Sequence, residues 1–400
     1  MNKIWDFFSS ERIVFGNGSI NRLNLVLERL QARNVLLITD PGIMSTGMVE
    51  PIISMLKESG VSVVLYDKAV PEPPIETAIE CYQFAQSQIK TDVIIGLGGG
   101  SSIDLAKIVS LLLAHGGSPL EYAGEYKVPG PVIPLVAIPT TAGTGSEVTS
   151  VAVLTDVKNN LKVGISDNYL RPTVALLDPE LTIGLPPYVT ACSGIDALSH
   201  AIEAYMAKDY KYLQGEGEVL FQGSFPLSDV LAFEAIRLIT ESLTIAVQQG
   251  ANLEARSNMM LGSLLAGMAF SNSGTAAAHA LAYPIGGLTK SPHGEVTGLL
   301  LPYVMKFNSM VQLEKTKKIA NVLHINTNTM NNQEIGIAVS DFFLQLLESI
   351  GLPSKLTEIG IAEVDIPEIA EKALTIERLI RINPRVPRKK EFETLLTMAL

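Results

Sequence analysis

The sequence is poor in cysteine and basic residues and lacks long hydrophobic runs, and each shortage excludes a class of protein. Its 400 residues include 2 cysteines, Cys81 and Cys192, too few for a disulfide framework and typical of a reducing compartment. The 30 Lys and Arg against 41 Asp and Glu give a formal net charge of −11, which argues against a nucleic-acid surface. No apolar run approaches the roughly eighteen residues of a membrane span, and the first ten residues lack a signal-peptide core. We therefore expect a cytoplasmic protein that binds neither nucleic acid nor membrane.

The pattern of hydrophobic residues changes near residues 180–190. Before this point, short apolar runs alternate with helical stretches, a pattern typical of a parallel sheet covered on both faces. After it, a period of 3.6 residues dominates. The expected strands are 12–16, 34–40, 61–67, 92–100, 132–139, 149–156 and 173–178, with helices at 47–59, 75–88 and 101–115. The later helices are expected at 190–207, 227–248, 252–270, 333–350 and 389–399. We predict an α/β domain over residues 1–185, an all-helical domain over residues 186–400, and a ligand cleft between them.

Residues 211–224 do not fit the helical period around them. Within this stretch, Glu218–Gly223 matches the recognition core of a picornaviral 3C-type protease. A natural surface loop is one interpretation, and an insertion of engineered origin is the one we favour. Neither bears on function.

The most specific chemical pattern consists of one aspartate and three of the chain's 5 histidines. Asp196 and His200 are four residues apart in a predicted helix, so their side chains share one face. His279 lies in a second helical stretch, and His293 stands between Pro292 and Gly294, where a turn or helix start is expected. A carboxylate with three imidazoles suits Fe(II) or Zn(II), whereas calcium and magnesium prefer oxygen ligands. A metal site is favoured over four unrelated structural residues.

Two glycine-containing loops suggest a dinucleotide site. The first, Gly98-Gly99-Gly100-Ser101 and on to Asp104, follows an apolar strand and opens a helix, where free N–H groups attract a diphosphate. A plain strand-to-helix turn would explain this loop alone. The second runs from Pro139 to Glu147 and adds the hydroxyls of Thr140, Thr141 and Thr144. Together the loops favour NAD or NADP as a cofactor.

Asp40 ends the strand at 34–40. A carboxylate there can accept hydrogen bonds from the adenosine ribose and repel a 2′-phosphate, which favours NAD over NADP. Because Pro41 and Gly42 follow, Asp40 is also a candidate to initiate a turn.

Five motifs together resemble the iron-containing (group III) alcohol dehydrogenase family. They are GGGSSIDLAK, IPTTAGTGSEVT, GIDALSHAIEAY, GMAFSNSGTAAAHALAYPIGG and SPHGEVTGLLLPYVMKFN, and the resemblance runs from about Ile13 to the NPR at 383–385. It implies a dinucleotide-binding domain followed by a helical domain, Fe(II) in the cleft, and a homo-oligomer. The implied metal ligands are Asp196, His200, His279 and His293. The implied cofactor contacts are Gly98, Gly99, Gly100 and Ser101 at the diphosphate and Thr140, Thr141, Thr144 and Lys162 on the nicotinamide side.

One position departs from the resemblance. Many members of the family carry a further histidine four residues after the third metal ligand, and Tyr283 stands there in this chain. A tyrosine is a poor base at neutral pH, so Tyr283 is either a catalytic hydroxyl or an aromatic that fills the pocket. Val151 and Phe270 are further candidates for a mostly apolar substrate pocket.

The implied activity is metal-dependent, NAD(H)-linked hydride transfer between a small primary alcohol or diol and its aldehyde. Three alternatives remain. A hydroxyacid–oxoacid transhydrogenase would pass hydride between two substrates through tightly held NAD. A dehydroquinate synthase-like lyase would need several cationic side chains to bind an anionic substrate. The region around the metal motifs contains few Lys and Arg residues, which disfavours this alternative. A non-catalytic metal-binding protein would leave the two cofactor loops without a purpose.

Overall fold

The computed structural model describes residues 4–159, 161–213 and 219–400, which form two compact units. The α/β unit comprises Phe8–Gly184, and the helical unit comprises Leu185–Leu400 together with residues 4–7. The predicted fold class, an α/β domain with a parallel sheet followed by a helical region, is confirmed. Residues 4–7, however, group with the helical unit rather than with the α/β domain to which we assigned them.

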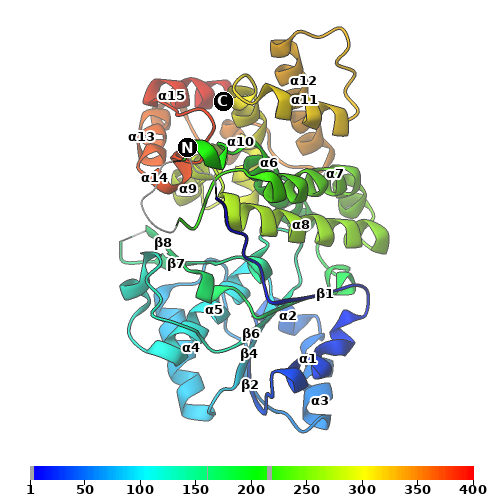
Figure 1. Cartoon of the computed structure of the whole chain (residues 1–400), viewed down its shortest axis with the longest axis vertical. Helices are drawn as coiled ribbons and strands as arrows, with labels where there is room; N and C mark the ends of the chain where they lie inside the picture. Colours follow the sequence, from blue (N-terminus) through cyan, green and yellow to red (C-terminus); the bar gives the residue numbers. More distant parts are fainter. Residues whose placement is uncertain (1–3, 160, 214–218) are drawn as a thin grey trace. The chain divides into compact units, whose positions relative to one another are not determined.

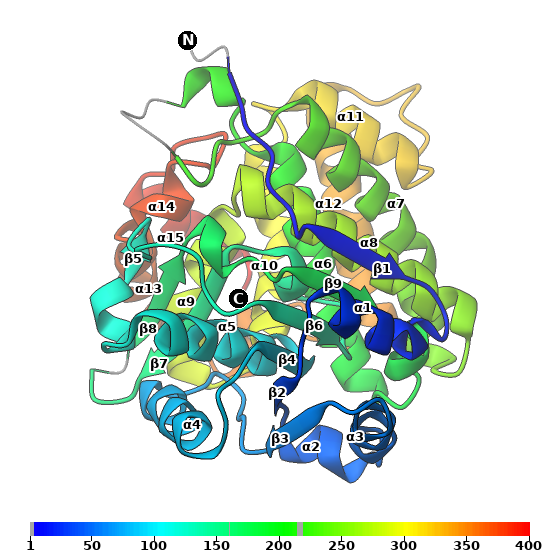
Figure 2. The same ribbon diagram turned by 60° about the horizontal axis from the view of Figure 1, so that its bottom comes forward.

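A six-stranded parallel sheet forms the centre of the α/β unit (Figures 1 and 2). Its strand order is β1-β9-β6-β4-β2-β3, and every pairing in it is parallel. The strands are β1 (Arg12–Phe15), β2 (Asn34–Ile38), β3 (Ser62–Tyr66), β4 (Val93–Gly98), β6 (Leu135–Pro139) and β9 (Val174–Leu177). The helices of this unit are α1 (Leu23–Arg29), α2 (Pro41–Ser45), α3 (Val49–Glu58), α4 (Ile75–Gln88) and α5 (Gly100–His115).

Both faces of the sheet are buried along its central strands β2, β4, β6 and β9, which explains why these strands are mostly apolar. Leu36 and Ile38 of β2 belong to a core that contains residues of α4 and α5. Val35 and Leu37 point to the opposite face and pack with residues of α1 and α3. The sequence shows no alternation here because neither face meets water.

The apolar run at 149–156 is a strand, but it lies outside the main sheet. β7 (Val151–Asp156) pairs antiparallel with β8 (Leu161–Ser166), and β8 pairs with β5 (Gly124–Glu125) in a small second sheet. Burial alternates along β7, with Ala152 and Leu154 buried against the core around α5. Only one face of β7 is covered, whereas the central strands of the main sheet are buried on both faces.

The helical unit contains ten α-helices among its described residues, including all five that the sequence predicted. They are α6 (Pro187–Met206), α7 (Pro226–Gln248), α8 (Leu253–Ser273), α9 (Ala277–Thr289), α10 (His293–Asn308), α11 (Leu313–Val322), α12 (Asn332–Ser349), α13 (Ile366–Leu374), α14 (Glu377–Ile380) and α15 (Lys389–Met398). Within the described ranges, no helix is both long and apolar enough to cross a membrane.

Glycines bring α10 close to α6. A Cβ added at Gly294 would collide with the carbonyl group of Cys192, and one at Gly298 would lie 2.6 Å from the Ile195 side chain. Cys192 and Ile195 precede Asp196 on α6, so this contact sets the first turn of α10 beside that aspartate. The packing of small residues thus positions His293, the first residue of α10.

Part of the 211–224 segment lies outside the described residues, namely 214–218, which include Glu218 of the protease motif. The remainder is part of the fold. Leu220 and Phe221 are buried, and the backbone N–H groups of Gln222 and Gly223 donate to the carbonyls of Asn272 and Ser273. An engineered origin stays a prediction, but the described residues of the motif, 219–223, include two buried side chains and do not form an exposed loop.

Candidate metal and cofactor sites

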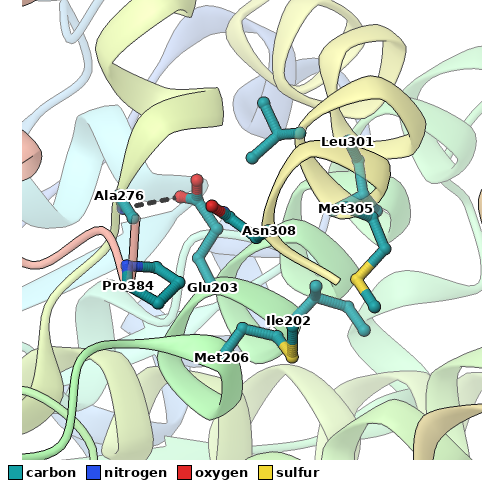
Figure 3. Close-up of a pocket in the computed structure, with 9 residues that line it drawn as sticks. Ile202, Glu203, Met206, Ala276, Leu301, Met305, Asn308 and Pro384 are labelled. Carbon is teal, nitrogen blue, oxygen red and sulfur yellow. Dashed lines mark hydrogen bonds between the residues drawn. The ribbon is translucent and has the colours of Figure 1, made fainter. Parts of the chain in front are cut away.

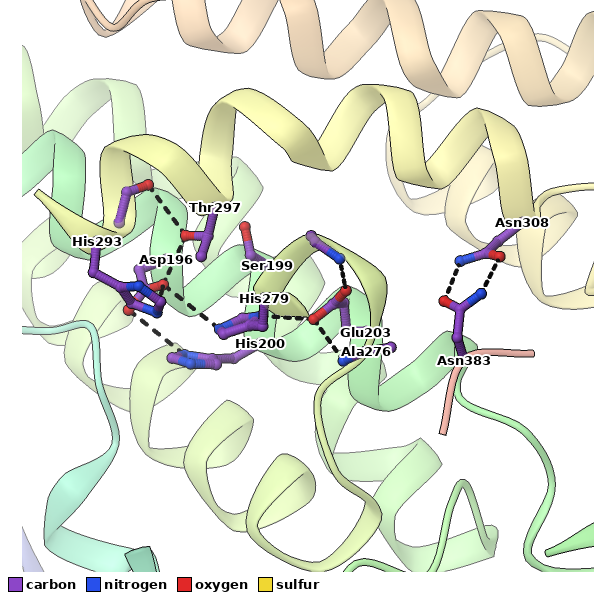
Figure 4. A network of polar contacts seen from close by, with 12 residues as sticks. Asp196, Ser199, His200, Glu203, Ala276, His279, His293, Thr297, Asn308 and Asn383 are labelled. Carbon is purple, nitrogen blue, oxygen red and sulfur yellow. Dashed lines mark hydrogen bonds and ion pairs between the residues drawn. The ribbon is translucent and has the colours of Figure 1, made fainter. Parts of the chain in front are cut away.

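Three helices of the helical unit bring the predicted metal ligands together (Figure 4). Asp196 and His200 lie one turn apart on α6, His279 lies in the first turn of α9, and His293 begins α10. Asp196 Oδ1 is 3.9 Å from His279 Nε2 and 4.0 Å from His293 Nε2. Asp196, His279 and His293 each offer one ligand atom within 4.8 Å of the others.

His200 approaches the other carboxylate oxygen of Asp196. Its Nδ1 lies 3.9 Å from Asp196 Oδ2, and its ring stacks on that of His279 with centroids 4.7 Å apart. Ligand atoms that share one ion at about 2.1 Å lie roughly 3–4 Å apart. The spacing within the cluster is therefore close to that of a metal site.

Two nitrogen atoms in this cluster are buried and have no hydrogen-bond partner among the described residues. They are His200 Nδ1 and His279 Nε2, both of which point toward Asp196. A buried polar atom normally has a partner, because leaving it unsatisfied costs about 1–3 kcal/mol. A divalent ion would satisfy both nitrogens at once, so the residues present fit such an ion.

Burial controls the charge of the cluster. It lowers the pKa of His200 to about 4, which leaves this imidazole neutral and able to act as a ligand at pH 7. Burial would also raise the pKa of Asp196, but the three histidines and the Thr297 hydroxyl hold that pKa below its usual value. Burial opposes protonation of His279, yet the Glu203 carboxylate raises its pKa. A metal and a proton compete for His279 Nε2, which makes metal affinity depend on pH.

Two residues that hydrogen-bond to the predicted ligands were not identified from the sequence. Glu203 accepts a hydrogen bond from His279 Nδ1 at 2.6 Å, and Thr297 Oγ1 donates to Asp196 Oδ1 at 2.8 Å. Glu203 is three residues after His200 and seven after Asp196, on the same face of α6. Helical spacing was thus a signal that could have revealed it.

Aromatic side chains border the metal cluster. Phe270 stacks on His200 with ring centroids 4.1 Å apart, and Tyr283 lies 5.8 Å from the His293 ring. Both residues are half-buried. The third pocket candidate, Val151, belongs to the α/β unit, where its carbonyl accepts a hydrogen bond from Lys107.

The two glycine-containing loops of the α/β unit touch each other. A Cβ at Gly100 would lie 2.6 Å from Thr144 Cγ2, and one at Gly99 would lie 3.6 Å from Thr141 Cγ2. Gly98, at φ +149°, ends β4, and Gly99 is the N-cap of α5. These contacts bring the helix start and the threonine loop together, as a dinucleotide site requires.

Asp40 and Asp104 both have protein partners at this site. Asp40 caps α2 by accepting a hydrogen bond from Ile43 N, and it also accepts one from the hydroxyl of Ser102. Asp104 is half-buried and accepts hydrogen bonds from Ser146 Oγ and Val153 N. Asp104 therefore holds the second loop in place, and a direct contact with cofactor stays a prediction.

The remaining cofactor candidates differ in their surroundings. Thr140 Oγ1 is buried and has no partner in the described structure, so its hydroxyl is available to a ligand. Ser101 Oγ accepts from Glu72 N at 3.2 Å, and Lys162 pairs with the Glu72 carboxylate at 2.5 Å. Glu72 thus links two predicted contact residues, and no motif in the sequence indicated it.

Comparison with known proteins identifies the family. The model of the iron-containing alcohol dehydrogenase family matches residues 10–179, and that of the C-terminal domain of Fe-containing alcohol dehydrogenases matches residues 190–400. The chain therefore belongs to the iron-containing alcohol dehydrogenases, which are oxidoreductases.

Several proteins of known name align with this chain over nearly its whole length. A long-chain-alcohol dehydrogenase of Geobacillus thermodenitrificans is 39% identical over 385 residues, which are 94% of this chain and 93% of that protein. An NAD-dependent methanol dehydrogenase of Bacillus methanolicus is 35% identical over 99% of this chain and 100% of its own length. A hydroxyacid-oxoacid transhydrogenase of Bos taurus is 32% identical over 97% of this chain and 88% of its own. The crystal structure of a 1,3-propanediol oxidoreductase superposes with a TM-score of 0.92 at 34% identity, covering 100% of both chains.

Proposed function

We propose that this chain is an Fe(II)-dependent, NAD(H)-linked dehydrogenase that interconverts a small primary alcohol or diol with its aldehyde. The observation that carries the proposal is the pair of buried, unpartnered nitrogens at His200 and His279, which face the Asp196 carboxylate. With His293 they provide an Asp/His₃ donor set, which suits Fe(II) and also Zn(II). Membership in an iron-containing family favours Fe(II).

The residues have distinct tasks in this proposal. The chemistry that a divalent ion supplies at such a site is Lewis acidity, which acidifies an alcohol and polarises an aldehyde carbonyl. The Asp196 carboxylate reduces the positive charge of the site and so moderates that acidity. Phe270, stacked on His200, contributes an apolar wall that favours an uncharged substrate.

The α/β unit supplies the cofactor contacts. The backbone at Gly98–Ser101 and the start of α5 offer N–H groups to a diphosphate, and Thr140 offers a free hydroxyl. Asp40, beside Ser102 at the end of β2, disfavours a 2′-phosphate and so favours NAD. The NAD dependence of a relative that is 35% identical supports the same choice.

The test measures turnover against metal content. The purified protein is stripped with a chelator and assayed with NAD⁺ and a series of small primary alcohols and diols, before and after anaerobic Fe(II) or Zn(II) is added. We expect activity only in the metal-loaded protein, with Fe(II) the more effective. Equal turnover by stripped and loaded protein would contradict the proposal.

A transhydrogenase is the second candidate, because one relative carries that name. It would exchange hydride between a hydroxyacid and an oxoacid without releasing NADH. Steady accumulation of free NADH from one alcohol favours the dehydrogenase. Product formation only when both substrates are present favours the transhydrogenase.

A further inference from the structure

Glu203 is a buried carboxylate behind the metal cluster, on the side of His279 away from Asp196 (Figure 4). It lies on α6 and is 3% exposed. Its Oε2 accepts hydrogen bonds from Ala276 N at 2.8 Å and from His279 Nδ1 at 2.6 Å, and its Oε1 accepts one from Ala278 N at 2.6 Å. Three donors therefore converge on one carboxylate.

The start of α9 makes a buried negative charge tolerable at this place. Ala276 is the N-cap of α9, and the N–H groups of Ala276 and Ala278 belong to the helix end that carries partial positive charge. A charged carboxylate buried without such donors would cost several kcal/mol. Glu203 thus joins α6 to the helix that carries His279.

The hydrogen bond to Glu203 determines which nitrogen of His279 carries the proton. A carboxylate accepts hydrogen bonds only, so Nδ1 must be the donor. In the neutral ring Nε2 then has a free lone pair, and Nε2 is the buried, unpartnered atom that faces Asp196 at 3.9 Å. The contact also orients the imidazole ring, because two backbone N–H groups of α9 hold the Glu203 carboxylate in place.

The surroundings hold Glu203 in this position (Figure 3). The cavity beside it has a volume of about 10 Å³, room for one water molecule at most, and its lining is mostly apolar. The one amide in that lining, Asn308, is engaged in a reciprocal pair with Asn383, with distances of 2.9 and 3.0 Å. The Glu203 side chain therefore has no other polar group of the cavity to turn to.

We propose that Glu203 is a positioning residue, which holds His279 protonated on Nδ1 and thereby raises the affinity of the site for a divalent metal. This inference rests on the proposed function, which places a metal at Asp196 and the three histidines. It adds a second buried negative charge, so that one divalent ion is balanced by Asp196 and Glu203 together.

The test uses the full chain, stripped with a chelator and titrated with Co(II) as a coloured probe. Glu203→Gln keeps the shape of the side chain but replaces one accepting oxygen with an NH₂ group. Either a helix N–H or His279 then loses its acceptor. We expect Co(II) affinity, measured by competition with a chelator, to fall about 10- to 100-fold and the visible absorption band to change. NADH binding should stay at the wild-type value.

Ser199→Ala is the matched control. Ser199 is buried on the same helix, and its hydroxyl donates to the Ile195 carbonyl rather than to one of the four predicted ligands. We expect its Co(II) affinity to equal that of the wild type. A lowered melting temperature of Glu203→Gln with unchanged Co(II) affinity and spectrum would overturn the inference, because it would show a purely structural role.

A second measurement keeps the inference testable if Glu203→Gln does not fold. Wild-type protein labelled with ¹⁵N-histidine reports the protonated nitrogen of each ring by NMR, and His279→Ala assigns the His279 signal. We expect protonation at Nδ1, and a neutral ring protonated at Nε2 would overturn the inference. If wild-type protein binds no Co(II), the proposed function fails. If the Glu203→Gln variant binds Co(II) as tightly as the wild type does, only the inference on Glu203 fails.

Discussion

The metal cluster of the helical unit and the cofactor loops of the α/β unit are built in opposite ways. The metal cluster depends on side chains, which come from three helices and leave two buried nitrogens without partners. The cofactor loops depend on the backbone, where missing side chains at Gly99 and Gly100 let two loops touch. A side-chain site should be destroyed by removing atoms and a backbone site by adding them. The predictions below test this contrast.

The largest effect is expected from His279→Ala. Loss of one ligand should remove the metal and lower kcat roughly 10³-fold, since the ion supplies several kcal/mol of charge stabilisation. The affinity for NADH, which depends on the other unit, should not change. Metal analysis, turnover and NADH fluorescence of the same sample check this. Normal turnover of a metal-free variant would show that the ligand assignment is wrong.

Adding one methyl group should damage the α/β site. In Gly100→Ala the new Cβ would lie 2.6 Å from Thr144 Cγ2, which forces the two loops apart. We expect NADH affinity to fall at least about 10-fold and stability to fall by about 1–3 kcal/mol, with metal content unchanged.

Gly164→Ala is the matched control, since it adds the same methyl group where there is room for it. No described atom lies within 4 Å of a Cβ at Gly164, and its φ is outside the left-handed region. It should bind NADH like the wild type. Equal losses in both variants would mean that the contact between the loops is unimportant.

Acidification should change the free energy of unfolding with opposite signs through His200 of the helical unit and Glu147 of the α/β unit. His200 has a pKa of about 4 when folded and about 6.5 when unfolded, so the unfolded chain takes up the proton first. Stability contributed by neutral His200 is therefore lost as pH falls from about 6.5 to 4, by about 3 kcal/mol in the metal-free protein. Burial raises the pKa of Glu147 in the α/β unit to about 7, so its contribution increases as pH falls from about 7 to 4.5.

Variants separate these two contributions. Glu147→Gln should make the loss of stability in acid steeper, and His200→Gln should make it shallower. Denaturant unfolding of chelated protein, followed by circular dichroism, measures both. The fluorescence of Trp5, the single tryptophan, follows the helical unit alone. Parallel pH profiles in all three proteins would contradict the assignment.

The smallest effect is expected from Tyr283→Phe. The Tyr283 hydroxyl makes no hydrogen bond within the described part of the chain, and its ring remains 5.8 Å from that of His293. We expect kcat to change less than about 3-fold with an unchanged pH profile, as for an aromatic that fills space. A loss of about 10²-fold, the size of a general acid or base contribution, would make Tyr283 catalytic.

The positions of helices and strands could be predicted from the sequence better than the pairing of the strands. The strand at 149–156 was expected, but its pairing with β8 in a second sheet depends on contacts that no local pattern encodes. The clustering of Asp196 with the three histidines was predictable because histidine is rare in this chain and an i,i+4 pair on a helix is specific. Glu203 was not singled out, because a glutamate on a helix is usually solvated. Glu72 was missed for a similar reason, since its contacts with Ser101 and Lys162 join distant segments.

The stacking of Trp5 on Phe225, with ring centroids 4.7 Å apart, has a consequence for biosynthesis. Asp6 also exchanges two hydrogen bonds with the Gln222 side chain, so residues 5 and 6 find their partners about 220 positions later in translation. At roughly 5–20 residues per second, that delay is about 10–45 s. The whole α/β unit leaves the ribosome in this interval. The α/β unit can therefore fold before Phe225, the stacking partner of Trp5, has been synthesised.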